Sequence, residues 1–279
     1  MNLRNPFTQG LLILVLIIFA SCSTKIEDEA MKVTSKSEKA IELYENAYQI
    51  AYRVLDLDKA VSIYNEAIQE DPNFFMAYYQ LATFYLFHKN DKEFVENAKA
   101  AIECNLALSD GEKIQKKILE KWLNDRNADA SELGIQLVNL YPDDPDSYLN
   151  LGFIYYMNKD YPNAIKAFEK SMNMEDRGDL YCGPKLAIVP ICMLGYSYLL
   201  SNQLEQTKIS FDKYITMFPN DQNPYDCKAD YFMATKEYNK AYESYMKAYS
   251  MDTTYKGFLQ RALYAKELND SIQKDLNGQ

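Results

Sequence analysis

Apolar and aromatic residues recur along the chain with a period of about 34 residues. The clearest rows occupy matching positions in successive periods: Tyr44, Ala47, Ala60, Tyr64, Ala67 and Pro72; Tyr78, Leu81, Ala82, Tyr85 and Ala101; Tyr148, Leu151, Gly152, Tyr155, Ala164, Phe168 and Ser171; Leu194, Gly195, Tyr198, Phe211 and Pro219; Tyr225, Ala229, Phe232, Ala241, Tyr245 and Ala248. Within a row the large residues lie three or four apart, which places them on one face of a helix. Each period therefore predicts two antiparallel helices that need their neighbours to bury the apolar stripe.

Proline placement agrees with this helical pattern. A proline inside a helix would cost ~3 kcal/mol, because it removes a hydrogen bond and clashes with the preceding turn. The prolines of the repeating rows lie at period ends or in the first turn of a helix: Pro72, Pro142, Pro145, Pro162, Pro190, Pro219 and Pro224. A first-turn N–H lacks a helical partner in any case, so the pattern predicts uninterrupted helices.

The rows resemble the tetratricopeptide repeat, in which aromatic, Leu-Gly, Tyr, Ala and Pro positions are fixed within about 34 residues. The resemblance implies an all-α fold, a right-handed α-solenoid of about six helix-turn-helix units with a C-terminal capping helix. It divides the chain into 41–74, 75–108, 111–144 and 145–178 as units 1–4 (41–178), 179–187 as an insertion, 188–221 and 222–255 as units 5 and 6 (188–255), and 256–279 as the capping helix. Unit 3 is degenerate, since Lys117 and Lys121 occupy positions that are usually apolar.

The first 22 residues differ in composition from the repeats. The apolar run from Leu11 to Ala20 would span only ~15 Å as a helix, about half of a bilayer core, so residues 1–21 are predicted to be a signal peptide. The following Phe19-Ala20-Ser21-Cys22 resembles the bacterial lipoprotein cleavage box, although Phe19 replaces the usual aliphatic residue. The resemblance implies a lipid on Cys22. The alternative is an ordinary secretory signal followed by an incidental cysteine.

Residues 22–40 are polar, and we expect the lipidated cysteine to be followed by a flexible tether. Many lipoproteins kept at the inner membrane have an aspartate directly after the cysteine, where this chain has Ser23. The cluster Glu27-Asp28-Glu29 resembles the surface-export signal of some Gram-negative lipoproteins. The expected location is therefore the cell envelope, lipid-anchored at the outer membrane, with the periplasmic and surface faces both open.

Composition narrows the classes of function. The formal net charge of −10 repels phosphate backbones and argues against nucleic-acid binding. The single histidine, His88, argues against a metal site and against a histidine-dependent catalytic pair, and no cofactor-binding motif is present. We therefore expect no enzyme, no cofactor and no metal. Cys104, Cys182, Cys192 and Cys227 lack Cys-x-x-Cys spacing, and either a Cys182–Cys192 disulfide or unpaired thiols fit their positions.

The resemblance also implies a concave groove lined by the first helix of each unit. The candidate groove residues are Tyr52, Tyr79, Thr83, Leu149, Phe153, Tyr156, Tyr196 and Met233. The ends of the groove are acidic, with Glu42 and Glu45 at one end and Asp226 and Asp230 at the other. Because basic residues are missing, the groove lacks the clamp with which related proteins hold the acidic tail of a chaperone. The alternative is that some of these side chains pack against neighbouring helices.

These features favour a membrane-tethered scaffold that binds an apolar or aromatic helix or extended segment of another protein. One alternative is a component of the outer-membrane assembly or envelope-division machinery, whose repeats the segment 211–219 resembles. Another is a surface glycan-binding lipoprotein, although such proteins carry large insertions and here only 179–187 is inserted.

Overall fold

The computed structural model describes residues 31–54, 56–175 and 188–277. The predicted signal peptide, Cys22, the insertion at 179–187 and Cys182 lie outside these residues. Within the described ranges, no helix is both long and apolar enough to cross a membrane.

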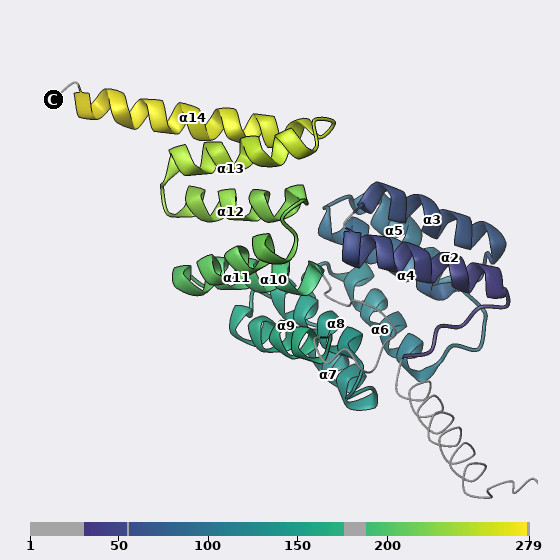
Figure 1. Ribbon diagram of the computed structural model, residues 1–279. Helices are drawn as coiled ribbons and strands as arrows, with labels where there is room; N and C mark the ends of the chain where they lie inside the picture. Colours follow the sequence, from purple (N-terminus) through teal and green to yellow (C-terminus); the bar gives the residue numbers. More distant parts are fainter. Residues whose placement is uncertain (1–30, 55, 176–187, 278–279) are drawn as a thin grey trace, which may run out of the picture.

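The fold is an all-α solenoid, as the repeat pattern predicts (Figure 1). The helices are α2 (Glu38–Gln49) with its π-helical extension η1 (Ile50–Val54), α3 (Leu57–Glu70), α4 (Phe75–Phe87), α5 (Asp91–Glu103), α6 (Asp110–Asn124), α7 (Ser131–Leu140), α8 (Pro145–Met157), α9 (Tyr161–Glu175), α10 (Ile188–Leu200), α11 (Leu204–Met217), α12 (Gln222–Ala234), α13 (Tyr238–Met251) and α14 (Lys256–Asn277). Over the described ranges they form six hairpins followed by a single long helix, and each helix packs mainly against the next one along the chain.

Two glycines show why the repeat requires small residues. A Cβ atom at Gly152 would lie 2.6 Å from the ring of Phe168, and a Cβ at Gly195 would overlap the ring of Phe211. Both phenylalanines are fully buried. The two helices of units 4 and 5 therefore approach so closely that only glycine leaves space for the aromatic residue opposite it.

Unit 3 folds as a hairpin despite its weak pattern. Lys117 and Lys121 are exposed, so these two lysines need no apolar surroundings. The buried side of α6 instead uses Ile118, Leu119 and Trp122. The first helix thus keeps an amphipathic pattern, displaced from the usual repeat positions.

The segment Met31–Lys36, here called the N-terminal brace, corrects the prediction of a flexible tether as far as residue 40. The backbone N–H of Met31 donates to Asp144 Oδ2 at 3.1 Å, and the Thr34 hydroxyl donates to Glu112 Oε2 at 2.6 Å. The Ser35 hydroxyl donates to Asp71 Oδ2 at 2.6 Å. The brace therefore ties together the end of unit 1 and both ends of unit 3, which a repeat pattern alone gives no reason to expect.

The solenoid curves so that its first and fifth units meet. Helix α10 contacts η1, and Phe87 of α4 packs edge-on against Phe153 of α8 with ring centroids 4.9 Å apart. Figure 1 shows the first two hairpins lying beside the α10–α12 region. Neither α4 nor α10 contains a charged residue, which is typical of helices that are covered on more than one side.

Candidate protein-binding site

An apolar cavity of about 210 Å³ lies where the first two units meet α8 and α10. Four of the six units contribute to its wall, namely units 1, 2, 4 and 5. The lining residues are Ala51, Tyr52, Leu57, Ala60, Val61, Tyr64, Gln80, Thr83, Phe84, Phe87, His88, Phe153, Val189, Cys192 and Met193. Because these residues come from distant parts of the sequence, the cavity exists only when the solenoid is curved.

A chain of hydrogen bonds fixes the tyrosines on one side of this cavity. The Tyr52 hydroxyl donates to Gln80 Oε1 at 3.1 Å, and Gln80 Nε2 donates to the Tyr44 hydroxyl at 3.3 Å. Tyr48 stacks on Tyr52 with ring centroids 4.3 Å apart. Burial raises the pKa of Tyr52 well above its ordinary value, so this hydroxyl stays neutral and the wall stays uncharged.

Two phenylalanines close the cavity on the side of units 2 and 4. Phe153 packs edge-on against both Phe87 and the buried Phe168, the latter at 5.6 Å between centroids. Phe87 is 36% exposed, so it lies at the edge between cavity and solvent. A smaller hollow of about 40 Å³ lies on the other side of Phe87 and Phe153, between α4, α6 and α8.

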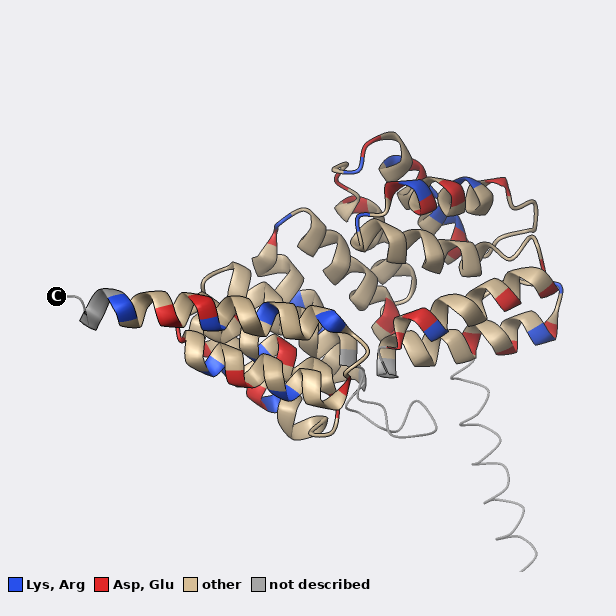
Figure 2. Ribbon diagram, turned by 90° about the horizontal axis from the view of Figure 1, so that it is seen from above, with Lys and Arg blue, Asp and Glu red and all other residues tan. Residues whose placement is uncertain are grey.

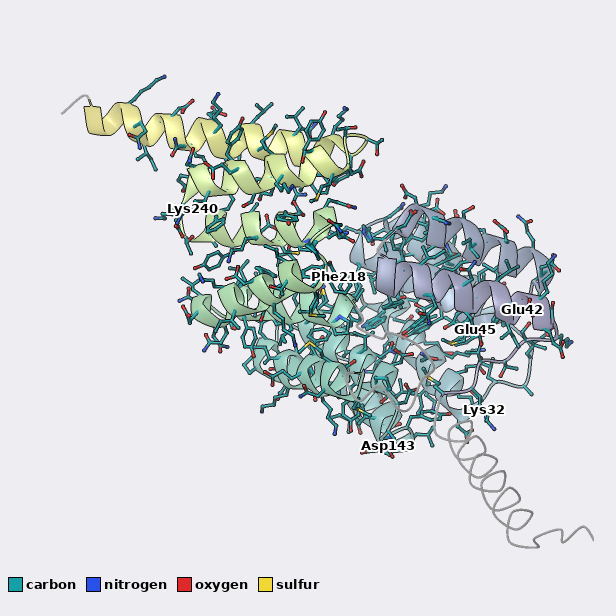
Figure 3. The ribbon with its side chains drawn as sticks, viewed as in Figure 1. Lys32, Glu42, Glu45, Asp143, Phe218 and Lys240 are labelled. Atoms are coloured by element: carbon teal, nitrogen blue, oxygen red, sulfur yellow. The ribbon has the colours of Figure 1, made fainter. Side chains whose placement is uncertain are left out.

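A wider acidic cleft of about 1170 Å³ adjoins the apolar cavity. Its wall comes from the α3 and α4 ends of the first units and from the loops around α12 and α14: Asp56, Leu57, Asp58, Phe84, His88, Met217, Phe218, Pro219, Asn220, Asp221, Gln222, Asn223, Asp226, Asp252, Thr254, Tyr255, Phe258 and Arg261. Figure 3 shows Phe218 on the side of the C-terminal helices that faces α2, whereas Lys240 lies on their opposite edge. Leu57, Phe84 and His88 line both hollows, so the cleft and the cavity share part of their walls.

At the C-terminal wall of the cleft, Arg261 forms ion pairs within a group of hydrogen-bonded side chains. Arg261 Nη2 lies 2.7 Å from Asp226 Oδ1, and Nη1 lies 3.8 Å from Asp230 Oδ1. The Tyr196 hydroxyl donates to Asp230 Oδ2 at 2.7 Å, and the Tyr245 hydroxyl donates to Asp230 Oδ1. Burial and nearby Asp230 raise the pKa of Asp226 to about 7, even though Arg261 acts in the opposite direction.

The structure divides the eight predicted groove residues into three groups. Tyr52, Thr83 and Phe153 line the apolar cavity. Tyr79 and Leu149 are only 3% and 2% exposed, which corrects their assignment to an open groove surface; they pack in the core.

The remaining three residues lie outside the cavity wall. Tyr156 packs edge-on against Tyr161, and Tyr196 packs against Phe211 as well as bonding to Asp230. Met233 packs beside the buried cluster of the last hairpin. Glu42 and Glu45, expected at the acidic end of the groove, lie along α2 away from Phe218 (Figure 3).

Several lining residues were missed by the repeat positions, among them Phe84, Phe87 and Met193. The signal that could have found them is the absence of charge from α4 and α10, which marks both helices as buried on two sides. Figure 2 shows the contrast, since the C-terminal helix carries blue and red residues along its length while inner helices are largely tan.

Three cysteines, Cys104, Cys192 and Cys227, lie in the described part of the chain, whereas Cys182 lies outside it. The Sγ atoms of Cys192 and Cys227 lie 3.5 Å apart, between α10 and α12, and both are free thiols. Cys104 is buried, and its thiol donates to the carbonyl of Ala100. A hydrogen bond with Cys192, together with burial, raises the pKa of the Cys227 thiol, so Cys227 is a weak nucleophile in this state.

His88 and the acidic residues form no metal-like group in the part of the chain that the structure describes. His88 follows the last residue of α4, and its Nδ1 lies 2.8 Å from the carbonyl oxygen of Phe84. Its ring also packs on that of Phe84, at 4.2 Å between centroids. The histidine therefore forms part of the wall shared by the two hollows.

Comparisons with known proteins agree with this architecture. Models of the tetratricopeptide repeat match residues 63–94 and 145–176. Among solved structures, yeast Tom70 is similar at 15% identity and a TM-score of 0.52, with 84% of this chain and 47% of that chain covered. The chain thus spans about half the length of yeast Tom70. No curated protein matches the chain.

Two further structures show lower overall similarity. The tetratricopeptide-repeat protein TTC0263 of Thermus thermophilus shares 15% identity over 81% of this chain and 98% of that chain, with a TM-score of 0.47. PilW, a type IV pilus biogenesis factor, shares 17% identity over 81% and 99% of the two chains, with a TM-score of 0.48.

The stacked hairpins define an α-solenoid, a class of proteins that present a curved surface to other proteins. The matched repeats, on a fold shared with solved repeat structures, identify the chain as a tetratricopeptide-repeat protein.

Proposed function

We propose that the protein is a membrane-tethered scaffold that captures another protein by taking up an apolar or aromatic side chain in the apolar cavity. The observation that supports this proposal is the cavity itself. It is about 210 Å³ in volume and is lined almost entirely by apolar side chains from four units. An apolar protein cavity of about 150 Å³ is large enough to bind benzene, so this one has room for a phenylalanine or leucine side chain. Such a buried anchor residue supplies much of the affinity in many protein interfaces.

The proposal is tested by filling the cavity. Val189→Phe on α10 and Thr83→Phe on α4 each place a ring in the cavity from a different helix. The probe is a displayed library of random twelve-residue peptides, sorted on the purified full-length protein. We expect the selected peptides to share an apolar or aromatic residue and to lose binding by at least about tenfold with either variant.

The matched control is Ile209→Phe, because Ile209 is 58% exposed on α11 and does not line the cavity. Circular dichroism and thermal unfolding establish that all three variants are folded. If the filled-cavity variants bind the selected peptides as well as the control does, the cavity is not the binding site.

The membrane tether is the second part of the proposal, and its support is the sequence around Cys22. In that arrangement the lipid holds Cys22 in the membrane, and the N-terminal brace, which begins nine residues later, bonds to units 1 and 3. Expression of Cys22→Ala should move the protein from the membrane fraction to the soluble fraction and abolish labelling by a palmitate analogue. Unchanged fractionation would remove the lipid anchor from the proposal.

A further inference from the structure

We infer that the captured segment carries a lysine or arginine next to its apolar anchor residue, with the cation lying in the acidic cleft. This inference rests on the proposed function, since it concerns the ligand of the same site. The two hollows adjoin each other. Leu57, Phe84 and His88 form part of both walls, so a segment whose anchor lies in the cavity can place its neighbouring residue in the cleft.

The charges in the cleft are unbalanced. Among the described residues of its wall, five aspartates face the single arginine Arg261; they are Asp56, Asp58, Asp221, Asp226 and Asp252. Arg261 is already paired with Asp226 and Asp230. Within the same described ranges, none of the other four aspartates forms an ion pair. A ligand cation would therefore supply a charge that the protein itself does not provide.

Local hydrogen bonds occupy some of the acceptor sites of these carboxylates, but they bring no positive charge into the cleft. Asp56 and Asp221 cap the N-termini of α3 and α12 through backbone N–H groups, and Asp252 accepts from Thr254. Each of these groups has a second oxygen or further lone pairs for a ligand. The capping contacts thus hold the carboxylates in position around the cleft.

The negative charge of the cleft favours some classes of ligand over others. A fatty-acyl chain would suit the apolar cavity, but its carboxylate or phosphate headgroup would meet four unpaired aspartates. An acidic peptide meets the same repulsion, which costs binding free energy when like charges are brought together. A segment with an apolar anchor and a neighbouring lysine or arginine matches both hollows, and the net charge of −10 attracts it from a distance.

The test uses a small set of fluorescent peptides with identical glycine-serine flanks. The anchor is Phe or Ala, and its neighbour is Lys, Gln or Glu. We expect the Phe-Lys peptide to bind tightest, the Phe-Gln peptide about five- to tenfold more weakly, and the Phe-Glu and Ala-Lys peptides weakest. Raising the salt concentration should weaken Phe-Lys binding and leave Phe-Gln binding nearly unchanged.

The protein variants are Asp58→Asn combined with Asp252→Asn, and the matched control is Asp270→Asn, an exposed position on α14 outside the cleft. The double variant should lose the preference for Lys over Gln, and the control should keep it. Equal binding of the Phe-Lys and Phe-Gln peptides by the unaltered protein overturns the inference while leaving the apolar anchor intact. Binding of the Phe peptides that survives Val189→Phe instead overturns the proposed function.

Discussion

The N-terminal part of the described chain, residues 31–175, and the C-terminal part, residues 188–277, are built from the same hairpins but held together differently. The N-terminal part has a brace whose residue Met31 bonds to Asp144, 113 residues further along. In the C-terminal part, helices contact mainly their neighbours in sequence, and the Arg261 group links only α12, α13, α14 and, through Tyr196, α10.

This difference bears on the binding site, because both hollows lie between the two parts. Repeat proteins are stabilised by contacts between neighbours, so a stack without further bonds opens locally at lower free energy. We therefore expect the N-terminal part to act as the fixed wall of the cavity and α10–α14 as the wall that adjusts to a ligand.

The largest effect is expected from Gly195→Val. Its side chain would overlap the fully buried ring of Phe211, which has no free space to move into, so we expect a loss of ~3–5 kcal/mol in the free energy of unfolding. The control is Gly257→Val, where the nearest atoms belong to Tyr255, a side chain that is 54% exposed. Hydrogen exchange should accelerate throughout α10–α13 and remain slow in α4–α6. Equal acceleration in both parts would show that they unfold as one unit.

Removing the brace by Glu112→Ala should have the next largest effect. Glu112 is fully buried and accepts from the Thr34 N–H, the Thr34 hydroxyl and the Ser109 N–H, so its loss leaves several donors unpaired. We expect ~2–3 kcal/mol of destabilisation, confined to the N-terminal part. Hydrogen exchange at residues 31–37 is the measurement, and exposed Glu120→Ala is the control. A slow-exchanging segment in the Glu112 variant would mean that the brace is held by other contacts.

A disulfide between Cys192 and Cys227 would give the C-terminal part the cross-link that it lacks. The two sulfurs lie 3.5 Å apart, and a small-molecule disulfide can take up the two electrons and two protons released when the thiols join. After treatment with oxidised glutathione we expect an internal disulfide, a mass lower by about 2 Da, and stabilisation of up to ~2 kcal/mol, less than an unstrained bridge gives. Cys192→Ser should abolish the mass change, whereas Cys104→Ser should not. Glutathione adducts without the internal bridge would contradict the prediction.

The smallest effect is a dependence of stability on pH, with one contribution from each part. Burial and the neighbouring charges of Asp146 and Asp230, respectively, raise the pKa of Asp144 and of Asp226 to about 7, above the ordinary value near 4. The folded chain therefore binds protons that the unfolded chain has lost between about pH 4 and pH 7, so stability falls as the pH rises through this range. We expect the melting temperature to drop by a few °C from pH 4.5 to pH 7.5.

The two contributions can be separated by substitution. Asp144→Asn should remove the pH dependence of exchange at the brace, and Asp226→Asn should reduce it in α12–α14, where burial also raises the pKa of Asp221. Melting temperatures that rise between pH 4.5 and pH 7.5 in the unaltered protein would contradict the direction.

Most of the fold could be predicted from the sequence, because the residue types at the fixed positions of a repeat reflect how its two helices pack. Gly152 and Gly195 are small because an aromatic residue lies opposite each of them, and the prolines mark the starts and ends of helices. Unit 3 was harder to assign, since its buried side uses Gln115, Ile118 and Trp122 rather than the usual positions. The brace could not be predicted, since its hydrogen bonds reach carboxylates far away in the sequence.

The candidate site was only partly predictable for a related reason. The positions on each first helix include Tyr52, Thr83 and Phe153, whose side chains line the apolar cavity. They also include Tyr79 and Leu149, which are buried in the core cluster of the first units and in the α8–α10 cluster, respectively. How tightly the solenoid curves depends on small rotations between units, which no single repeat encodes.

By itself the sequence determined the helical hairpins, their boundaries near glycine and proline, and the apolar character of α4 and α10, because these depend on residues close together in the chain. Only the tertiary structure decided that units 1 and 5 meet, that the inner surface closes to an apolar cavity, and that aspartates from α3, α12 and the α13–α14 turn share one cleft. The physical reason is that these neighbours are set by the sum of all rotations along the solenoid, whereas each helix is set by its own pattern of apolar residues.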